Sequence, residues 1–195
     1  IKAGRGHNTA LAVSKDGVTV ESNTLLMENK DYPDGLTCHV RDPKVWAQDG
    51  KYYMVQGART LDDHGQLLVF ESTDKFNWTF LQALKTPHHF GYMWECPDLF
   101  CVDGRWFLVC SPQGVPHVET RFQHVYSRGL FPFHGDSRPE SSLGAFVARD
   151  LGSDLSAPRP SQAPPPLLSL PRRCLPAPHV TTPHPDPPPN PRTPR

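Results

Sequence analysis

A repeat of 54 residues is the feature that most restricts the fold of this 195-residue chain. Segment 42–55 aligns without a gap with segment 96–109, and both contain a proline, an Asp-Gly pair and two adjacent aromatic residues at equivalent positions. Asp-Gly is a strong hairpin signal, because both residues can adopt positive φ. A period near 50 residues made of short strands is typical of a β-propeller, in which each repeat is one blade of four strands.

The rest of the predicted folded part also consists of short strands and turns. A second echo relates the Ser-x-Asp segment at 14–16 to that at 72–74, as expected for equivalent hairpins of two blades. No stretch of helical length shows the 3.6-residue period of an amphipathic helix, so the fold class is predicted to be all-β. The clearest strands are short runs of aromatic and β-branched residues at 52–55, 66–70, 98–102 and 106–110.

Composition divides the chain near residue 130. Residues 1–133 hold 18 of the 19 aromatic residues and all seven lysines, whereas residues 156–195 hold 15 prolines and no aromatic residue. A segment of that kind cannot bury enough apolar surface to offset the entropy lost on ordering. We therefore expect a partial propeller over 1–130 and a disordered, proline-rich tail over 131–195. The tail is either a genuine linker or sequence translated in a wrong frame.

The folded part is too short for a closed propeller. Closure takes at least four or five blades, which at this period means roughly 200 residues or more. Residues 1–130 supply about two and a half blades at the same period. We therefore expect a fragment of a larger domain with open strand edges.

Charge and cysteine usage exclude several classes of protein. Twenty basic residues balance twenty acidic ones, which argues against a nucleic-acid-binding surface, and no apolar run reaches the roughly 18–20 residues of a membrane span. The five cysteines show no CxxC pair, so free thiols are expected, and neither a metal site nor a cofactor is predicted. Residues 1–6 contain no signal-peptide core, which predicts a cytoplasmic chain that begins within a domain.

Each repeat has one carboxylate just before its shared proline. Arg41-Asp42 and Glu95-Cys96 each precede a strand that should line the propeller axis, so Asp42 and Glu95 are expected to face one funnel. Cleavage of a glycosidic bond uses such a pair, with one carboxyl ionised and the other protonated. Nearby aromatic residues could wall a sugar site. The alternative is structural, because an Arg-Asp-Pro segment can also serve as a salt bridge or an Asx-turn.

The segments 41–46 (Arg-Asp-Pro-Lys-Val-Trp) and 94–100 (Trp-Glu-Cys-Pro-Asp-Leu-Phe) resemble two of the three signature motifs of glycoside hydrolase family 32. This family comprises the invertases and sucrose-6-phosphate hydrolases. His39 and the Ser-Pro-Gln-Gly segment at 111–114 also fit, and the likeness covers about residues 5–130. The resemblance implies a five-bladed propeller followed by a β-sandwich, and hydrolysis of sucrose, sucrose 6-phosphate or a short fructan.

The resemblance also implies roles for individual residues. Hydrolysis in this family retains configuration through a covalent fructosyl-enzyme. Glu95 matches the general acid/base, and Asp42 matches the carboxylate that stabilises the transition state by holding fructose hydroxyls. By the same resemblance, Arg41 would bind substrate and orient the nearby carboxylates, and Cys96 would tune the setting of Glu95. From their position beside the two carboxylates, Trp46 and Trp94 are also expected to bind substrate.

The third motif, a Trp-Met-Asn-Asp-Pro-Asn-Gly-like segment that carries the nucleophile, has no match in the chain. We expect it upstream of Ile1, so the chain by itself should be inactive and the missing blades should restore turnover. Three alternatives remain open. The chain could be a non-catalytic sugar-binding propeller fragment, a proline-rich interaction protein, or part of another five-bladed glycosidase family.

Overall fold

The computed structural model describes residues 6–102, 105–118, 122, 128–134 and 142–148. Residues Ile1–Pro160 form one unit and Ser161–Arg195 a second, which lies outside the described residues. Except for one short 3-10 helix, η1, every described element is a strand, which confirms the all-β prediction. None of the described elements is a helix long and apolar enough to cross a membrane. The predicted blade number and the disordered tail stay predictions.

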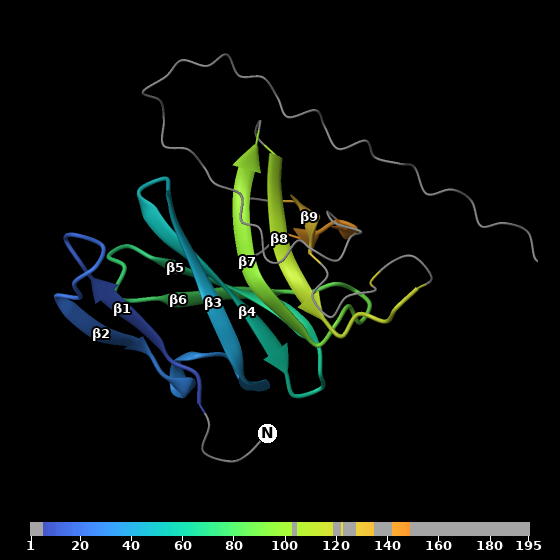
Figure 1. The fold of residues 1–195 in the computed structure, drawn as a ribbon, viewed down its shortest axis with the longest axis horizontal. Coiled ribbons are helices and arrows are strands. Elements are labelled where there is room, and N and C mark those ends of the chain that lie inside the picture. Colours follow the sequence, from blue (N-terminus) through green and yellow to red (C-terminus); the bar gives the residue numbers. More distant parts are fainter. Residues whose placement is uncertain (1–5, 103–104, 119–121, 123–127, 135–141, 149–195) are drawn as a thin grey trace, which may run out of the picture. The chain divides into compact units, whose positions relative to one another are not determined.

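The strands form antiparallel sheets in chain order, as expected for successive propeller blades (Figure 1). β1 pairs with β2, the central sheet has the order β3-β4-β5-β6, and the third sheet has the order β10-β9-β8-β7 with β11 on β9. The elements are β1 (Thr9–Val13), β2 (Ser22–Met27), η1 (Asn29–Asp31), β3 (Leu36–Gln48), β4 (Lys51–Thr60), β5 (Gly65–Ser72), β6 (Thr79–Leu84), β7 (Met93–Val102), β8 (Arg105–Gln113), β9 (Gly129–His134), β10 (Ser142–Leu143) and β11 (Val147–Ala148).

The Asp-Gly turn between β3 and β4 has the predicted geometry. Asp49 and Gly50 both have positive φ, 50° and 77°, and the strands pair up to Gln48 and Lys51 on either side. A two-residue turn of this kind matches the right-handed twist of the strands that it joins. The equivalent pair at 103–104 lies outside the described residues. At Asp16-Gly17 only Gly17 has positive φ, because a longer loop joins β1 to β2.

The two Ser-x-Asp segments fold into the same loop, which gives the second echo a structural basis. Asp16 Oδ1 accepts hydrogen bonds from the backbone N–H groups of Val18 and Thr19 at 2.8 and 2.7 Å. Asp74 Oδ1 accepts from the corresponding groups, two and three residues further along, at 2.8 Å each. These bonds favour the ionised carboxylate and hold the pKa of both aspartates well below its ordinary range.

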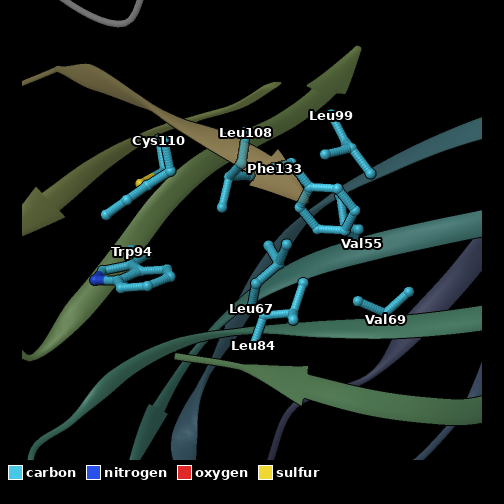
Figure 2. Close-up of a cluster of buried hydrophobic side chains, with 10 residues drawn as sticks. Val55, Leu67, Val69, Leu84, Trp94, Leu99, Leu108, Cys110 and Phe133 are labelled. Carbon is cyan, nitrogen blue, oxygen red and sulfur yellow. The ribbon is translucent and has the colours of Figure 1, made fainter. Parts of the chain in front are cut away.

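Both faces of the central sheet are buried. Successive side chains of a strand point to opposite faces, so the unbroken apolar run along β5 fills two cores. One core, shown in Figure 2, lies between the central sheet and β7–β9 and has Trp94 and Phe131 among its largest members. The other packs the central sheet against Met27 and Tyr32. The four cysteines in the described residues are free thiols, as predicted, and burial raises the pKa of Cys110.

Candidate active site

The site forms where β3 and β7 each contain a bulge. Pro43 and Pro97 have no N–H to give to the strand ladder, and the register shifts between Arg41 and Lys44 in one strand and between Glu95 and Asp98 in the other. The residue before each proline has positive φ, 59° at Asp42 and 47° at Cys96. A positive φ is unfavourable for residues other than glycine, and residues held in this conformation are often found at functional sites.

The bulges bring Arg41 and Glu95 into an ion pair. The Arg41 guanidinium donates from Nη2 and Nε to the single oxygen Glu95 Oε1, at 2.6 and 3.2 Å. The Arg41 and Glu95 side chains remain 34% and 22% exposed, so the pair is reachable from solvent. Glu95 Oε2 accepts no hydrogen bond within the described residues, and this oxygen is therefore available to an incoming group.

Asp42 reaches across to the other bulge. Its Oδ2 accepts a hydrogen bond from the Cys96 backbone N–H at 2.8 Å. The bulge gives the Cys96 N–H no place in the ladder between β7 and β8, and the carboxylate satisfies this donor instead. Asp42 and Glu95 lie on strands of successive repeats, and each carboxylate contacts the other strand: Glu95 binds Arg41, and Asp42 accepts from the Cys96 backbone N–H. That both carboxylates face one funnel stays a prediction.

His39 belongs to this group, although the sequence pointed to it only through its likeness to the family motif. Its Nδ1 lies 3.0 Å from Arg41 Nη1. A guanidinium has only donors, so Nδ1 is the acceptor and the proton of the neutral ring sits on Nε2. His39 and Glu95 thus hold Arg41 from two sides and fix its orientation.

Gly57 lets β7 approach β4 closely at the site. It pairs with Arg41 in the strand register, and a Cβ added to it would overlap the Trp94 carbonyl oxygen. Trp94 precedes Glu95, so the space at Gly57 lets the strand that carries Glu95 lie close to β4. Sequence reasoning missed Gly57, yet an isolated glycine inside a strand pattern is itself a signal of close backbone approach.

The two predicted tryptophans differ in burial, and only the prediction for Trp46 stays open. Trp94 is fully buried, stacks on Phe131 and donates from Nε1 to the Phe90 carbonyl oxygen at 2.8 Å. Its predicted role in a sugar-binding wall is therefore wrong, because the ring is part of the core. Trp46 stacks on Tyr53 and packs against that core, and no ring contact or hydrogen bond in the described residues joins it to Arg41 or Glu95.

The family model described as "Glycosyl hydrolases family 32 N-terminal domain" matches residues 3–165 of the chain. The match continues well past residue 130. The expectation that the likeness to the family ends there is wrong, and β9 adds a strand to the third sheet over Gly129–His134.

Curated relatives carry the same family likeness. The chain is 41% identical over 155 residues to a sucrose-6-phosphate hydrolase of Bacillus subtilis, a match that covers 76% of this chain and 32% of that protein. It is 37% identical over 154 residues to a raffinose invertase of Escherichia coli, with 76% and 31% covered. The chain therefore spans about a third of the length of the curated relatives it matches.

Two solved structures resemble the fold of this chain. A mutant of the Bombyx mori GH32 beta-fructofuranosidase in complex with sucrose matches with a TM-score of 0.61 and 32% identity, covering 72% of this chain and 31% of that one. A sucrose-6-phosphate hydrolase from Lactobacillus gasseri matches with a TM-score of 0.54 and 27% identity, covering 62% and 25%.

Proposed function

The chain belongs to glycosyl hydrolase family 32, and from this premise we propose that it forms part of an enzyme that hydrolyses the β-fructofuranosidic bond of sucrose or sucrose 6-phosphate. The single observation that carries the proposal is the contact between the two bulges, where Arg41 binds one oxygen of Glu95 and the other oxygen stays open. The names of the relatives, which include sucrose-6-phosphate hydrolases and a beta-fructofuranosidase, support the choice of substrate.

Glu95 is the proposed general acid/base. Arg41 and His39 fix the Oε1 side of the carboxyl group, so a proton on Oε2 has one defined direction in which to move. In the first step that proton passes to the glycosidic oxygen as the bond to fructose breaks. In the second step the ionised Glu95 takes a proton from water. A residue that acts as acid and then as base is the requirement of a retaining glycosidase.

Asp42 is the proposed transition-state stabiliser. Its Oδ2 is held by the Cys96 N–H, and its Oδ1 has no hydrogen-bond partner in the described residues. A fixed carboxylate with one open oxygen can accept hydrogen bonds from sugar hydroxyls. These bonds strengthen as positive charge develops at the anomeric carbon, which lowers the barrier. Cys96 contributes through its backbone N–H, and its thiol has no role in the proposal.

The nucleophile is proposed to be an aspartate from a segment outside this chain. Its carboxylate would attack the anomeric carbon of fructose and form the covalent fructosyl-enzyme, while Glu95 protonates the leaving oxygen. Water activated by Glu95 would then release fructose with its configuration retained. No residue of the chain matches the family's nucleophile motif.

The test is a chimera in which residues 9–148 of this chain replace the aligned segment of the Bacillus subtilis hydrolase, which then supplies the rest of the fold. We expect the chimera to hydrolyse sucrose 6-phosphate or sucrose, and Glu95→Gln to lower kcat/KM by about 10²–10⁴-fold. A folded chimera whose Glu95→Gln variant is equally active would remove Glu95 from the acid/base role. Binding of sucrose without hydrolysis would favour a sugar-binding propeller.

A further inference from the structure

The side-chain contacts between β3 and β7 join residues separated by the length of the repeat. Arg41 pairs with Glu95, and Asp42 accepts from Cys96, each across a separation of 54 residues. The two strands belong to different sheets, yet equivalent positions of the two repeats lie side by side. Other residues of β3 and β7 that are 54 positions apart are therefore expected to lie close together as well.

Lys44 and Asp98 are a further pair at this separation. Lys44 lies three residues after Arg41, Asp98 lies three residues after Glu95, and the Lys44 ammonium lies 3.1 Å from Asp98 Oδ1. Asp98 is 2% exposed, whereas the Lys44 side chain is 35% exposed. Neither oxygen of the Asp98 carboxyl group makes a hydrogen bond in the described residues, so the ion-pair contact with Lys44 is the compensation that these residues offer to a buried carboxylate.

A buried carboxylate with a single partner restricts where that partner can lie. An ionised carboxylate in a dry interior is strongly unfavourable unless a cation stays close, and breaking such a pair costs more than the pair contributes. The Lys44 side chain therefore keeps β3 at one offset along β7. The Arg41–Glu95 pair lies on the same two strands, on the other side of both proline bulges.

We propose that Lys44 and Asp98 are positioning residues for the site, because their ion pair sets the offset between β3 and β7 at which Arg41 meets Glu95. This inference rests on the proposed function. It assigns the pair no contact with substrate and no transfer of a proton. The role is to hold the two bulges in register, so that the open oxygen of Glu95 and that of Asp42 face the same space.

The contact between the two bulges can be followed by NMR in the full chain, without substrate. The Arg41 Nε–H group donates to Glu95 Oε1, and the Cys96 N–H donates to Asp42 Oδ2, so both give assignable 15N–1H signals that report on the site. In Lys44→Met we expect both signals to move and hydrogen exchange at the Cys96 amide to become about tenfold faster or more. Lys44→Arg, which keeps the charge, should retain both signals.

The matched control is Lys51→Met. Lys51 also forms an ion pair between strands, with Glu71 at 3.0 Å, but within one sheet and at a more exposed place. Lys51→Met should leave the Arg41 and Cys96 signals unchanged. If Lys44→Met acted only by a general loss of stability, both lysine variants would shift these signals alike. If Lys44→Met does not fold, the double variant Lys44→Met with Asp98→Asn leaves no uncompensated charge and serves instead.

A folded Lys44→Met or double variant with both signals at their original positions would overturn the inference. In the chimera described above, the same variant should lower kcat for sucrose 6-phosphate by about tenfold or more with little change in KM, because it disturbs the acid/base geometry rather than binding. The two proposals can fail separately. An inactive chimera contradicts the proposed function, whereas unchanged NMR signals contradict only the positioning role.

Discussion

Asp42 in β3 and Cys96 in β7 occupy equivalent places in two successive repeats, and their backbones are alike. Each precedes a proline, each has positive φ, and each coincides with a register shift against the following strand. The charged side chains beside them differ between the two repeats and have opposite signs. The first repeat supplies the cations Arg41 and Lys44, and the second supplies their anions at the same two positions.

This difference shows how one repeated backbone supports two chemical roles. The bulge in β3 places a carboxylate that accepts a backbone N–H, and the bulge in β7 supplies that N–H. Neither repeat contains both halves of the candidate site. The function proposed for Glu95 therefore depends on the contact between repeats, which can be tested by changing the two halves together or one at a time.

The largest effect is expected from exchanging the paired charges. Arg41→Glu combined with Glu95→Arg keeps opposite charges facing each other, so the free energy of unfolding should change by only about 1 kcal/mol. The acid/base carboxyl group then sits on the wrong strand, and kcat/KM of the chimera should fall by about 10²–10⁴-fold. Hydrolysis rates and chemical denaturation of the same preparation measure both. Activity within tenfold of the parent would show that the two bulges are interchangeable.

A large loss of stability is expected from Gly57→Ala. The added methyl group would overlap the Trp94 carbonyl oxygen, so β4 and β7 must separate, at a cost of about 3 kcal/mol in the free energy of unfolding. Chemical denaturation followed by tryptophan fluorescence measures this change.

The matched control lies 54 residues further along. Ser111→Ala adds no atoms and removes the long hydrogen bond that the buried Arg128 donates to Ser111 Oγ at 3.3 Å, which contributes about 1.5 kcal/mol. Equal effects at Gly57 and Ser111 would contradict the close approach at Gly57.

A smaller difference is expected when each bulge receives a glycine. Cys96→Gly relieves a positive φ and keeps the backbone N–H, so it should raise the free energy of unfolding by about 0.5–1 kcal/mol. Asp42→Gly relieves the same backbone but removes the acceptor of the Cys96 N–H, and it should give no gain. The denaturant midpoints of the two variants, compared with that of the parent chain, measure the two changes in stability. A gain at Asp42 as large as that at Cys96 would mean that the Asp42–Cys96 bond does not stabilise the fold.

The smallest effect is expected at the two Ser-x-Asp loops, because both carboxylates are exposed. Their pKa in the folded chain lies below the ordinary value of 3.8, so each stabilises the fold above that pH, and the contribution is lost as acid protonates the folded form. The Tm advantage of the parent over Asp16→Asn and over Asp74→Asn should therefore be full at pH 6 and shrink below pH 3.8. A constant Tm difference down to pH 2.5 would contradict the loop geometry.

Much of the candidate site could be predicted because its signals are local. The repeat placed Arg41-Asp42 and Glu95-Cys96 at equivalent positions, and prolines at 43 and 97 follow them where the structure has the bulges. The burial of Trp94 could not be predicted, since the face on which it lies depends on how β7 packs against the central sheet. The role of Gly57 depends on the same packing, and the predicted strand at 52–55 stopped short of this glycine, whereas β4 continues to Thr60.

The sequence by itself determined the all-β class, the hairpin turn at Asp49-Gly50 and the family to which the chain belongs, because each depends on residues close together in the chain. Only the tertiary structure decided which charges meet. Arg41 and Glu95, and likewise Lys44 and Asp98, are 54 residues apart, and their contact exists only once two sheets bury a shared core. Burial also turns Asp98 from one of many carboxylates into a group that depends on a single lysine.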